Sequence, residues 1–484
     1  MNSRSHYDVA IIGAGLSGIA AGIRAALFGK SVCIFERHNA PGGLNSFYSL
    51  AGRKYDVGLH AVTNFVPAGV KGTALGRLLR QLRLDRDELA LREQKRSRIS
   101  FGPGGEASLR FTNRFEDLEA EVADRFPTQA DGFRRLAERV RGTPYPADGH
   151  DPSAREVFSA HLSDPLCREM LLSPVLFYGS AWENDMPFST AALLFRAILL
   201  EGLARPGEGI RRILRVLLAK YREAGGERRM KCGVCRIVAA ADRAAALVLD
   251  DATEVTADCV LSCVGAPETA ALIAGEDGGR VAAPREGAIA FVETISVFRE
   301  PAASLGWSED TIVFFNDSAT LRYENPSGSV DTRSGVLCLP GNFAYEAGEA
   351  APESQLKVTC LANYARWKGL SAEAYPAEKS RWFPKVQEAG RRHLPPVTDE
   401  ALAAATVAAD MFTPCTVERF TGRRGGAIYG SPDKSADGRT ALSNVFLCGA
   451  DQGLVGIMGA LLSGVMMANR HVLRPSPESA APGA

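Results

Sequence analysis

The chain has 484 residues, of which 46% are hydrophobic, and its 56 lysine and arginine residues balance 56 aspartate and glutamate residues. That length leaves room for a large core shared between two or more domains. A formal net charge of zero gives no sign of the basic surface with which proteins bind nucleic acids, so we expect no nucleic-acid partner.

The cysteines and the lengths of the apolar runs indicate the cellular compartment of the protein. The ten cysteines are scattered, several within strand-like apolar runs, which is typical of reduced thiols in a cytoplasmic protein. Cys232 and Cys235 form a CxxC, but no second pair or histidine cluster is nearby, so we interpret them as strand residues and predict no metal site. No apolar leader precedes the first predicted strand, and the run at 457–468 is shorter than the roughly 20 residues that span a bilayer. We predict a cytoplasmic protein, with peripheral membrane contact left open.

The first predicted unit is a strand, a glycine turn and a helix. Residues 8–12, DVAII, are apolar and β-branched, and GAGLSG at 13–18 separates them from a helix of small and apolar residues. Gly13 permits the tight turn, Gly15 lets a pyrophosphate approach the backbone, and Gly18 lets the helix pack closely on the strand. The phosphates would then meet free N–H groups at the helix N-terminus, supplied by Gly13, Ala14, Gly15, Leu16, Ser17 and Gly18.

A second strand, residues 31–35, ends at Glu36. An acidic side chain about 20 residues after the glycines suits a bidentate hydrogen bond to the hydroxyls of an adenosine ribose. Strand, turn, helix, strand and terminal carboxylate therefore occur in the order that predicts dinucleotide binding. An ordinary crossover would leave both the glycine spacing and Glu36 unexplained.

Another glycine pair follows the carboxylate closely. Arg37 is followed by the segment Gly42, Gly43 and Leu44, whose backbone could pass beside a bound dinucleotide, and then by DVGLH at 56–60. This continuation differs from that of a plain NAD domain and favours the larger cofactor FAD.

With these motifs the chain resembles the phytoene desaturase, carotenoid isomerase and retinol saturase group of FAD-dependent oxidoreductases, and more distantly the flavin amine oxidases. The resemblance rests on GAGLSG, on ERHNAPGG at 36–43, on DVGLH and on the C-terminal motif described below. It implies that Gly58, Leu59 and His60 lie beside the isoalloxazine ring and that the backbone near Val234 contacts the adenine. His60 is the candidate catalytic group, because an imidazole is the side chain suited to proton transfer near neutral pH. The alternative is a structural histidine whose hydrogen bonds are all made within the core.

Residues 71–91 read as a basic amphipathic helix. One side carries Leu75, Leu78, Leu79 and Leu82, and arginines are spread around it. A surface helix with a solvated face is one interpretation, and a helix that faces a membrane is the other.

The middle of the chain alternates helical and strand-like segments. We expect a hairpin around 101–111, helices over 115–141 and over 154–203 with interruptions at Pro165, Pro174 and Pro187, and a further helix over 210–224. Two interpretations are open for the apolar segments 171–179 and 191–200: they line an apolar cavity, or they form ordinary core helices. Strands are expected at 232–238, 257–264, 289–298, 311–315, 336–339 and 356–362, a hairpin at 245–255 and a helix at 372–393, with 401–410 of uncertain type.

The closing motif is NVFLCGAD at 444–451, which leads into a glycine-rich helix. Asp451 could hold a ribityl hydroxyl, order water at the pyrophosphate, or be only a helix cap. The helix N-terminus at Gly456, Ile457 and Met458 could stabilise negative charge on a reduced flavin, and we expect Leu59, Ile457 and Met458 to govern substrate placement. Amine oxidases carry Gly-Glu where this chain has Ala450-Asp451, so an amine substrate is less expected.

Together these features predict an α/β protein with a discontinuous Rossmann-type FAD-binding domain, residues 1–75, 206–285 and 413–474. An α+β substrate domain of mixed sheet and helices would comprise 76–205 and 286–412, followed by a disordered tail at 475–484. The predicted function is an FAD-dependent oxidoreductase that acts on carbon–carbon bonds of a lipophilic polyene, with desaturation favoured over isomerisation or saturation. The alternatives are a flavin-dependent amine or amino-acid oxidase and a dinucleotide-binding protein without turnover; the oligomeric state stays open.

Overall fold

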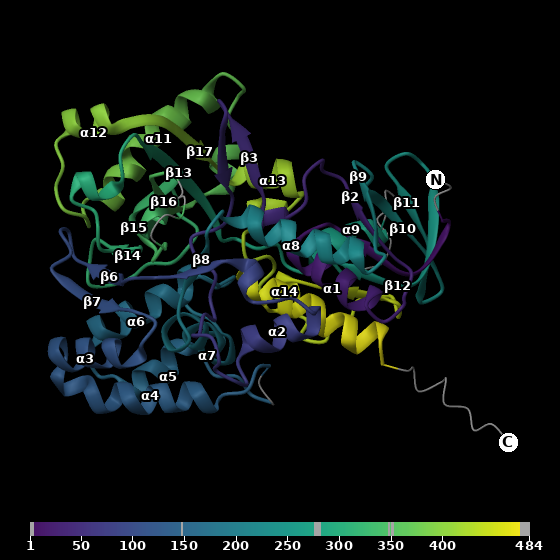
Figure 1. Ribbon diagram of the computed structural model, residues 1–484, viewed down its shortest axis with the longest axis horizontal. Helices are drawn as coiled ribbons and strands as arrows, with labels where there is room; N and C mark the ends of the chain where they lie inside the picture. Colours follow the sequence, from purple (N-terminus) through teal and green to yellow (C-terminus); the bar gives the residue numbers. More distant parts are fainter. Residues whose placement is uncertain (1–3, 147–148, 275–281, 347–348, 350–352, 475–484) are drawn as a thin grey trace.

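The computed structural model describes residues 4–146, 149–274, 282–346, 349 and 353–474, so the predicted tail at 475–484 lies outside the described residues. The chain forms two lobes (Figure 1). The lobe on the right holds both the purple N-terminal segment and the yellow C-terminal segment, and we call it the Rossmann lobe. The lobe on the left holds most of the middle of the chain, and we call it the second lobe.

A largely parallel sheet organises the Rossmann lobe. Its parallel strands lie in the order β9, β2, β1, β12 and β18, and the antiparallel pair β10 and β11 extends it from β12. Helices α1, α8 and α14 cover one face, and the β10–β11 pair packs over the other. Both faces of the central strands are therefore buried, which is why β1, β2 and β18 consist mainly of apolar, buried residues. The elements are β1 (His6–Ile12), α1 (Leu16–Ala26), β2 (Val32–Glu36), α8 (Ile210–Glu223), β9 (Glu227–Met230), β10 (Val234–Ala240), β11 (Arg243–Leu249), β12 (Glu254–Ser262), α9 (Ala266–Ala274), β18 (Val445–Leu447) and α14 (Gly456–Met467).

A mixed sheet organises the second lobe. Its strand order is β17, β13, β16, β15, β14, β6 and β7, and β14 pairs parallel with β6 while the other neighbours are antiparallel. The helices α3 to α7 form a layer below the sheet (Figure 1), and α11 packs on its other face. The strands are β6 (Ser97–Phe101), β7 (Ala107–Phe111), β13 (Ala290–Phe298), β14 (Ile312–Asn316), β15 (Val330–Cys338), β16 (Gln355–Ala362) and β17 (Thr406–Phe412). The helices are α3 (Phe115–Arg125), α4 (Ala130–Gly142), α5 (Ala154–His161), α6 (Pro165–Phe177), α7 (Phe188–Phe195) and α11 (Ala374–Arg391).

Shorter elements connect the two lobes and complete their edges. Two of these strands, β4 and β8, end beside the junction between the sheets, and they position the charged cluster described below. The short elements are β3 (Phe47–Leu50), β4 (Arg53–Asp56), α2 (Ala74–Leu82), β5 (Leu91–Glu93), β8 (Ala204–Pro206), α10 (Tyr364–Lys368), α12 (Asp399–Ala405) and α13 (Pro414–Thr421).

The predicted α/β fold class is confirmed, and several boundaries differ from the sequence prediction. Helix α2 ends at Leu82 and does not reach 91, because Arg83 takes a left-handed backbone conformation with φ 53°. Helix α6 continues through Pro174, since nearly all its residues are buried and packing outweighs the one lost hydrogen bond. Residues 401–410 divide into the end of α12 and the start of β17.

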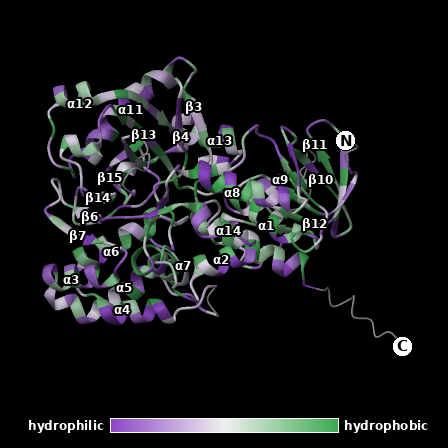
Figure 2. Cartoon of the chain, viewed as in Figure 1, coloured by the Kyte–Doolittle hydropathy of each residue, from purple (hydrophilic) through white to green (hydrophobic). Residues whose placement is uncertain are grey.

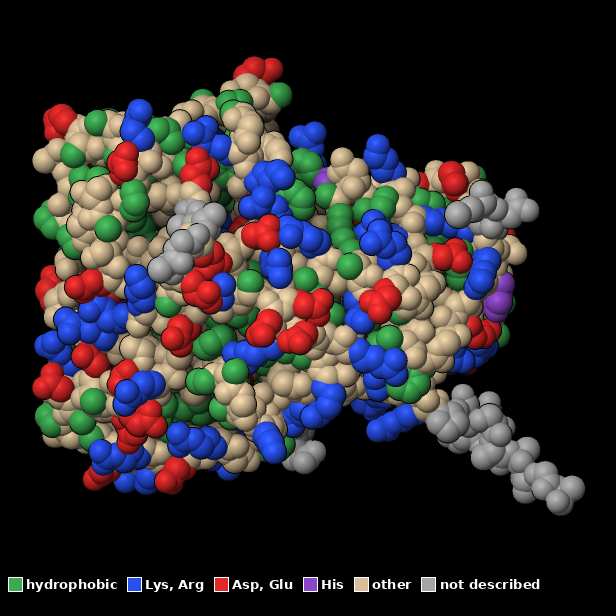
Figure 3. All heavy atoms as spheres, in the orientation of Figure 1, with side chains coloured by type: hydrophobic (Ala, Val, Ile, Leu, Met, Phe, Trp, Pro, Cys, Tyr) green, Lys and Arg blue, Asp and Glu red, His purple; other side chains and the backbone are tan. Residues whose placement is uncertain are grey.

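The strands of the two large sheets fall within the segments that the sequence analysis gave to each domain, although the boundaries themselves stay a prediction. Figure 2 shows hydrophobic green segments concentrated inside each lobe and hydrophilic purple residues on the outer helices α3 and α4. Acidic and basic side chains are interspersed over the face shown in Figure 3, as expected from the balanced composition. Within the described residues, no helix is both long and apolar enough to cross a membrane.

Candidate functional site

The N-terminus of α1 forms an open cradle of backbone groups. Gly13, with φ 98°, makes the turn after β1, and a side-chain Cβ at Gly18 would lie 2.3 Å from the carbonyl oxygen of Gly13. Both positions therefore require glycine. At Gly15, which caps α1 without a side-chain hydrogen bond, a Cβ would meet no atom within 4 Å. The helix N-terminus thus has the free space and the unpaired N–H groups that suit a phosphate.

Glu36 lies at the end of β2, beside this cradle. Its carboxylate accepts hydrogen bonds from the backbone N–H groups of Ala14 and His38, each at 2.7 Å. Each carboxylate oxygen has a further lone pair for a hydroxyl donor. The geometry therefore fits a ribose contact, which stays a prediction.

The second glycine pair lies against the first motif. The Gly42 N–H donates to the carbonyl of Ala14 at 2.8 Å, and a Cβ at Gly43 would lie 3.5 Å from the Cα of Gly15. A Cβ at Gly58 would come within 2.3 Å of the carbonyl oxygen of Leu44. The fold thus brings three separately predicted segments to one place, and close backbone contact is the reason for their glycines.

The segment predicted to contact the adenine lies near Arg37, and its role stays a prediction. Val234 is buried at the start of β10, and the Arg37 side chain lies beside the preceding Gly233, where a Cβ would be 2.9 Å from the Cβ of Arg37. Together with the cradle and Glu36, these residues fit an extended dinucleotide at the carboxyl ends of parallel strands.

Asp451 is not the cap of the last helix. The N-cap of α14 is Val455, whereas Asp451 lies in a short 3₁₀ turn before it. Its buried carboxylate accepts from the N–H of Ala266 at 2.6 Å and from that of Ser431 at 2.9 Å. This carboxylate joins three loops, and a ribityl contact for it stays a prediction.

Two cations face Asp451. The guanidinium of Arg423 lies 3.4 Å from one carboxylate oxygen, and the Lys434 Nζ lies 3.5 Å from the other. Burial lowers the pKa of Lys434 to about 8, even though the Asp451 carboxylate favours its charged form.

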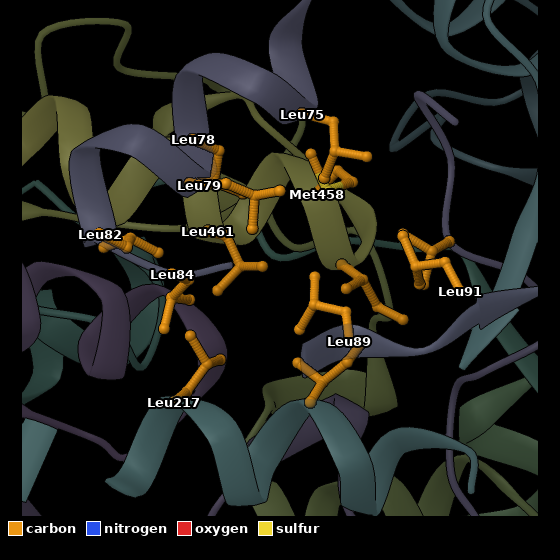
Figure 4. Close-up of a pocket in the computed structure, with 13 residues that line it drawn as sticks. Leu75, Leu78, Leu79, Leu82, Leu84, Leu89, Leu91, Leu217, Met458 and Leu461 are labelled. Atoms are coloured by element: carbon orange, nitrogen blue, oxygen red, sulfur yellow. The ribbon is translucent and has the colours of Figure 1, made fainter. Parts of the chain in front are cut away.

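The N-terminus of α14 presents a second open backbone. Gly456 has φ 72°, and a Cβ there would meet no atom within 4 Å, so the first amides of the helix remain accessible. The side chains of Ile457 and Met458, however, line a small apolar pocket between α2, α8 and α14 (Figure 4). Leu59 is fully buried in the same core cluster. The expectation that these three side chains face a substrate therefore differs from the structure, because they complete the core of the Rossmann lobe.

The leucines of α2 line the same pocket. Figure 4 shows Leu75, Leu78, Leu79 and Leu82 pointing from α2 toward α14. All four are buried, while Arg77 and Arg80 are exposed. In this conformation the leucine side is not available to a bilayer, and peripheral membrane contact stays a prediction.

His60 lies at the junction of the two lobes, in contact with a buried charged cluster. Its Nε2 is 3.0 Å from Glu293 Oε2 and 3.2 Å from the Thr359 hydroxyl. Glu293 and Thr359 are direct partners across β13 and β16, which explains why both meet the same ring. Lys357, two residues from Thr359, lies on the same face of β16 and donates to Glu293 Oε1 at 3.0 Å.

A second ion pair supports the backbone of the DVGLH segment. Arg205, only 3% exposed, bonds the Asp56 carboxylate at 2.7 Å and the carbonyls of Leu59 and His60 at 2.9 and 3.1 Å. Lys357 adds a bond to the Asp56 carbonyl at 2.8 Å. The cluster of Asp56, Arg205, Glu293 and Lys357 therefore contains two anionic and two cationic side chains, and its net charge is zero.

Electrostatics keep Glu293 ionised. Burial alone would raise the pKa of this carboxyl, but the Lys357 ammonium and the His60 ring together lower it to about 2. Sequence reasoning missed Arg205, Glu293, Lys357 and Thr359. The available signal was a charged residue inside an otherwise apolar strand, as in FVETISVF and LKVTCLA, because such residues are buried only when they are paired.

Aromatic side chains form a wall beside His60. The Tyr178 ring lies 6.2 Å from the His60 ring and 4.9 Å from that of Phe314. Phe177, the neighbour of Tyr178 in the chain, packs against Phe291 and Tyr323, and Phe291 in turn packs against Tyr429. The Tyr178 hydroxyl is buried and has no hydrogen-bond partner among the described residues. The predicted apolar segment 171–179 thus reaches the site, through the end of α6.

Comparison with known proteins agrees with this geometry. The model of the NAD(P)-binding Rossmann-like domain matches residues 11–85. The chain is 26% identical over 282 residues to a phytoene desaturase (lycopene-forming) of a Paracoccus species, covering 52% of this chain and 53% of that protein. It is 26% identical over 132 residues to a chloroplastic prolycopene isomerase of Arabidopsis thaliana, covering 27% of this chain and 21% of that protein. The chain therefore spans about half, or less, of the length of these curated relatives.

Solved structures resemble nearly the whole chain. A putrescine oxidase variant with a redesigned cofactor site superimposes with a TM-score of 0.61 at 18% identity, covering 97% of this chain and 99% of that one. At this identity the likeness shows the fold. The predicted resemblance to desaturases and isomerases, with a more distant relation to amine oxidases, is confirmed. The FAD prediction agrees as well, since these families are FAD-dependent and the Rossmann-like domain is present.

Proposed function

We propose that this protein is an FAD-dependent oxidoreductase that acts on carbon–carbon bonds of a lipophilic polyene, most readily by desaturation. The observation that carries the proposal is the aromatic wall of Tyr178, Phe314 and Phe291 beside His60. Apolar and aromatic walls with few polar groups suit a long hydrocarbon substrate.

The paired charges at the junction of the two lobes also favour a neutral, lipophilic substrate. A cationic amine is bound well where an acidic group lacks a counter-ion. Here Glu293 already contacts Lys357, and Asp56 already contacts Arg205. The cluster therefore offers no free negative charge to an amine, and a neutral substrate is favoured.

Different residues of the chain would bind the cofactor, orient the substrate and accept a proton. The cradle at Gly15, the carboxylate of Glu36 and the open N-terminus of α14 would hold FAD, which when bound supplies the redox chemistry by accepting a hydride. The aromatic wall would orient the polyene and exclude water. His60, whose Nδ1 makes no hydrogen bond within the described chain, would accept the proton that desaturation releases together with the hydride.

Two measurements test the proposal. Purified protein should release a flavin with the spectrum of FAD. Anaerobic mixing with polyenes of increasing conjugation should bleach the bound flavin and shift the absorption of the polyene to longer wavelength, with one double bond formed per flavin reduced. Product formed only by prereduced enzyme, without net flavin oxidation, would establish isomerisation instead.

Amine oxidation is the alternative that the structural neighbours raise. A panel of primary amines and amino acids should neither bleach the flavin nor yield hydrogen peroxide in air. Rapid bleaching by an amine, with no response to any polyene, would overturn the proposed substrate class and leave the cofactor assignment intact.

A further inference from the structure

Two histidines contact carboxylates on the sheet of the second lobe, and they differ in one respect. His393 is completely buried, and both its ring nitrogens are used: Nδ1 lies 2.9 Å from the Ser100 hydroxyl and Nε2 lies 3.2 Å from Asp317. His60 uses only Nε2, which faces Glu293 and Thr359. Its side chain remains 13% exposed, and no described residue bonds its Nδ1. His393 is therefore a structural group, whereas His60 has one nitrogen available.

We propose that Glu293 is a positioning residue, which fixes the His60 ring through Nε2 so that Nδ1 faces the substrate. This inference rests on the proposed function. Lys357 and Thr359 hold the Glu293 carboxylate at 3.0 Å each, so the acceptor has little freedom to turn. The Arg205 bonds to the carbonyls of Leu59 and His60 hold the backbone from which the ring projects.

The hydrogen bonds also define the form of the ring. An ionised carboxylate can only accept, so neutral His60 must carry its proton on Nε2, and Nδ1 is left with a lone pair. When Nδ1 takes a proton, the Nε2–H bond to Glu293 is kept and the ring becomes a cation beside an anion. The ring can therefore gain and lose a proton at Nδ1 without rotating.

The surroundings of the ring allow this exchange. The groups that face His60 are Glu293 from β13, Thr359 and Lys357 from β16, Arg205 from β8, the Cys338 thiol near its carbonyl and the Tyr178 ring at the end of α6. Glu293 and Asp56 offset Lys357 and Arg205, so the cluster is neutral with neutral His60 and gains one positive charge when Nδ1 is protonated. Glu293 is the only one of these anions in direct contact with the ring, within the described residues.

Glu293→Gln tests the proposal, because it keeps the shape and removes the charge. It also leaves Lys357 buried without a counter-ion, so Glu293→Gln/Lys357→Met serves as a second variant in which the charges stay balanced. The readout is the ¹⁵N spectrum of histidine side chains across pH, recorded on protein without substrate; the chain has seven histidines to assign. In wild-type protein the neutral His60 should carry its proton on Nε2. In Glu293→Gln its titration midpoint should fall by about 1–3 pH units, as expected for losing an adjacent negative charge, and in the double variant it should fall by less, because removing the Lys357 ammonium offsets part of that loss.

Asp317→Asn is the matched control, because it removes the carboxylate beside His393 and should move only that resonance. In turnover, Glu293→Gln should lower kcat and shift the acid side of its pH profile, with KM unchanged. Wild-type His60 protonated on Nδ1, or an unmoved titration in both variants, would overturn the positioning role. If the His60 resonance moves as expected but no polyene reacts, the proposed function fails and the positioning role stands.

Discussion

The two lobes hold their candidate functional groups in opposite ways. In the Rossmann lobe the contacts come mainly from backbone, at short turns such as Gly13 to Gly18 and Gly42 to Gly43, where the chain needs open space or a left-handed conformation. In the second lobe they come from side chains brought together across strands, as when the Lys357 ammonium donates to the Glu293 carboxylate over a separation of 64 residues. A backbone site leaves a local pattern of glycines in the sequence, whereas a side-chain cluster depends on strand register.

Gly15→Val should have the largest effect on flavin binding of any single change, because it alters the backbone site itself. A Cβ at Gly15 meets no atom of the protein within 4 Å, so the variant should fold normally. Its side chain would fill the space that the pyrophosphate needs, and flavin occupancy should fall to nearly zero. The measurement is the ratio of flavin to protein absorbance together with circular dichroism.

The control for that experiment is Gly104→Val, which introduces the same side chain in an exposed loop where a Cβ also meets nothing within 4 Å. It should retain flavin fully. A yellow, normally folded Gly15→Val protein would show that the cradle does not hold the cofactor.

The same difference explains what could be predicted from the sequence. The opening unit, the glycine pair and most strands were found, because turn geometry and hydrophobic runs are local signals. Glu293 and Lys357 were not singled out, since one charged residue in a strand says nothing about which strand lies opposite. The side chains of Ile457 and Met458 were assigned to the wrong surroundings, because the sequence does not show that α2 and α8 pack on that turn of α14.

Acid should destabilise the second lobe through Glu293. The pKa of this carboxyl is about 2 in the folded protein and 4.5 without neighbours, so its contribution to stability is present above the unfolded value and is lost as pH falls from about 4.5 to about 2. Between pH 5 and 2.5 the wild type should lose more free energy of unfolding than Glu293→Gln/Lys357→Met, by roughly 2–3 kcal/mol. Urea unfolding at each pH measures this difference.

Glu254→Gln is the control for the acid experiment, since Glu254 is exposed at the start of β12. Its loss of stability over the same range should follow that of the wild type. If the double variant also followed the wild type, the carboxylate of Glu293 would not be held in its ionised form by the cluster.

Alkali should have the opposite and smaller effect in the Rossmann lobe, through Lys434. Burial lowers the pKa of this lysine to about 8, so between about pH 8 and 10.5 the unfolded chain binds more protons than the folded one. The contribution of Lys434 to stability should therefore rise with pH across that window, whereas buried cysteines such as Cys33 and Cys259, whose pKa is raised by burial, contribute a fall that is the same in wild type and variant. Lys434→Met should lose this rise, and the two proteins should diverge by about 1–2 kcal/mol between pH 8 and 9.5, a range that ends before most tyrosines titrate. Lys95→Met, at an exposed position, should follow the wild-type stability curve over the same pH range. Parallel curves for wild type and Lys434→Met would mean that Asp451, 3.5 Å away, keeps the ammonium charged despite its burial, and the buried charges of both lobes would then be equally well paired.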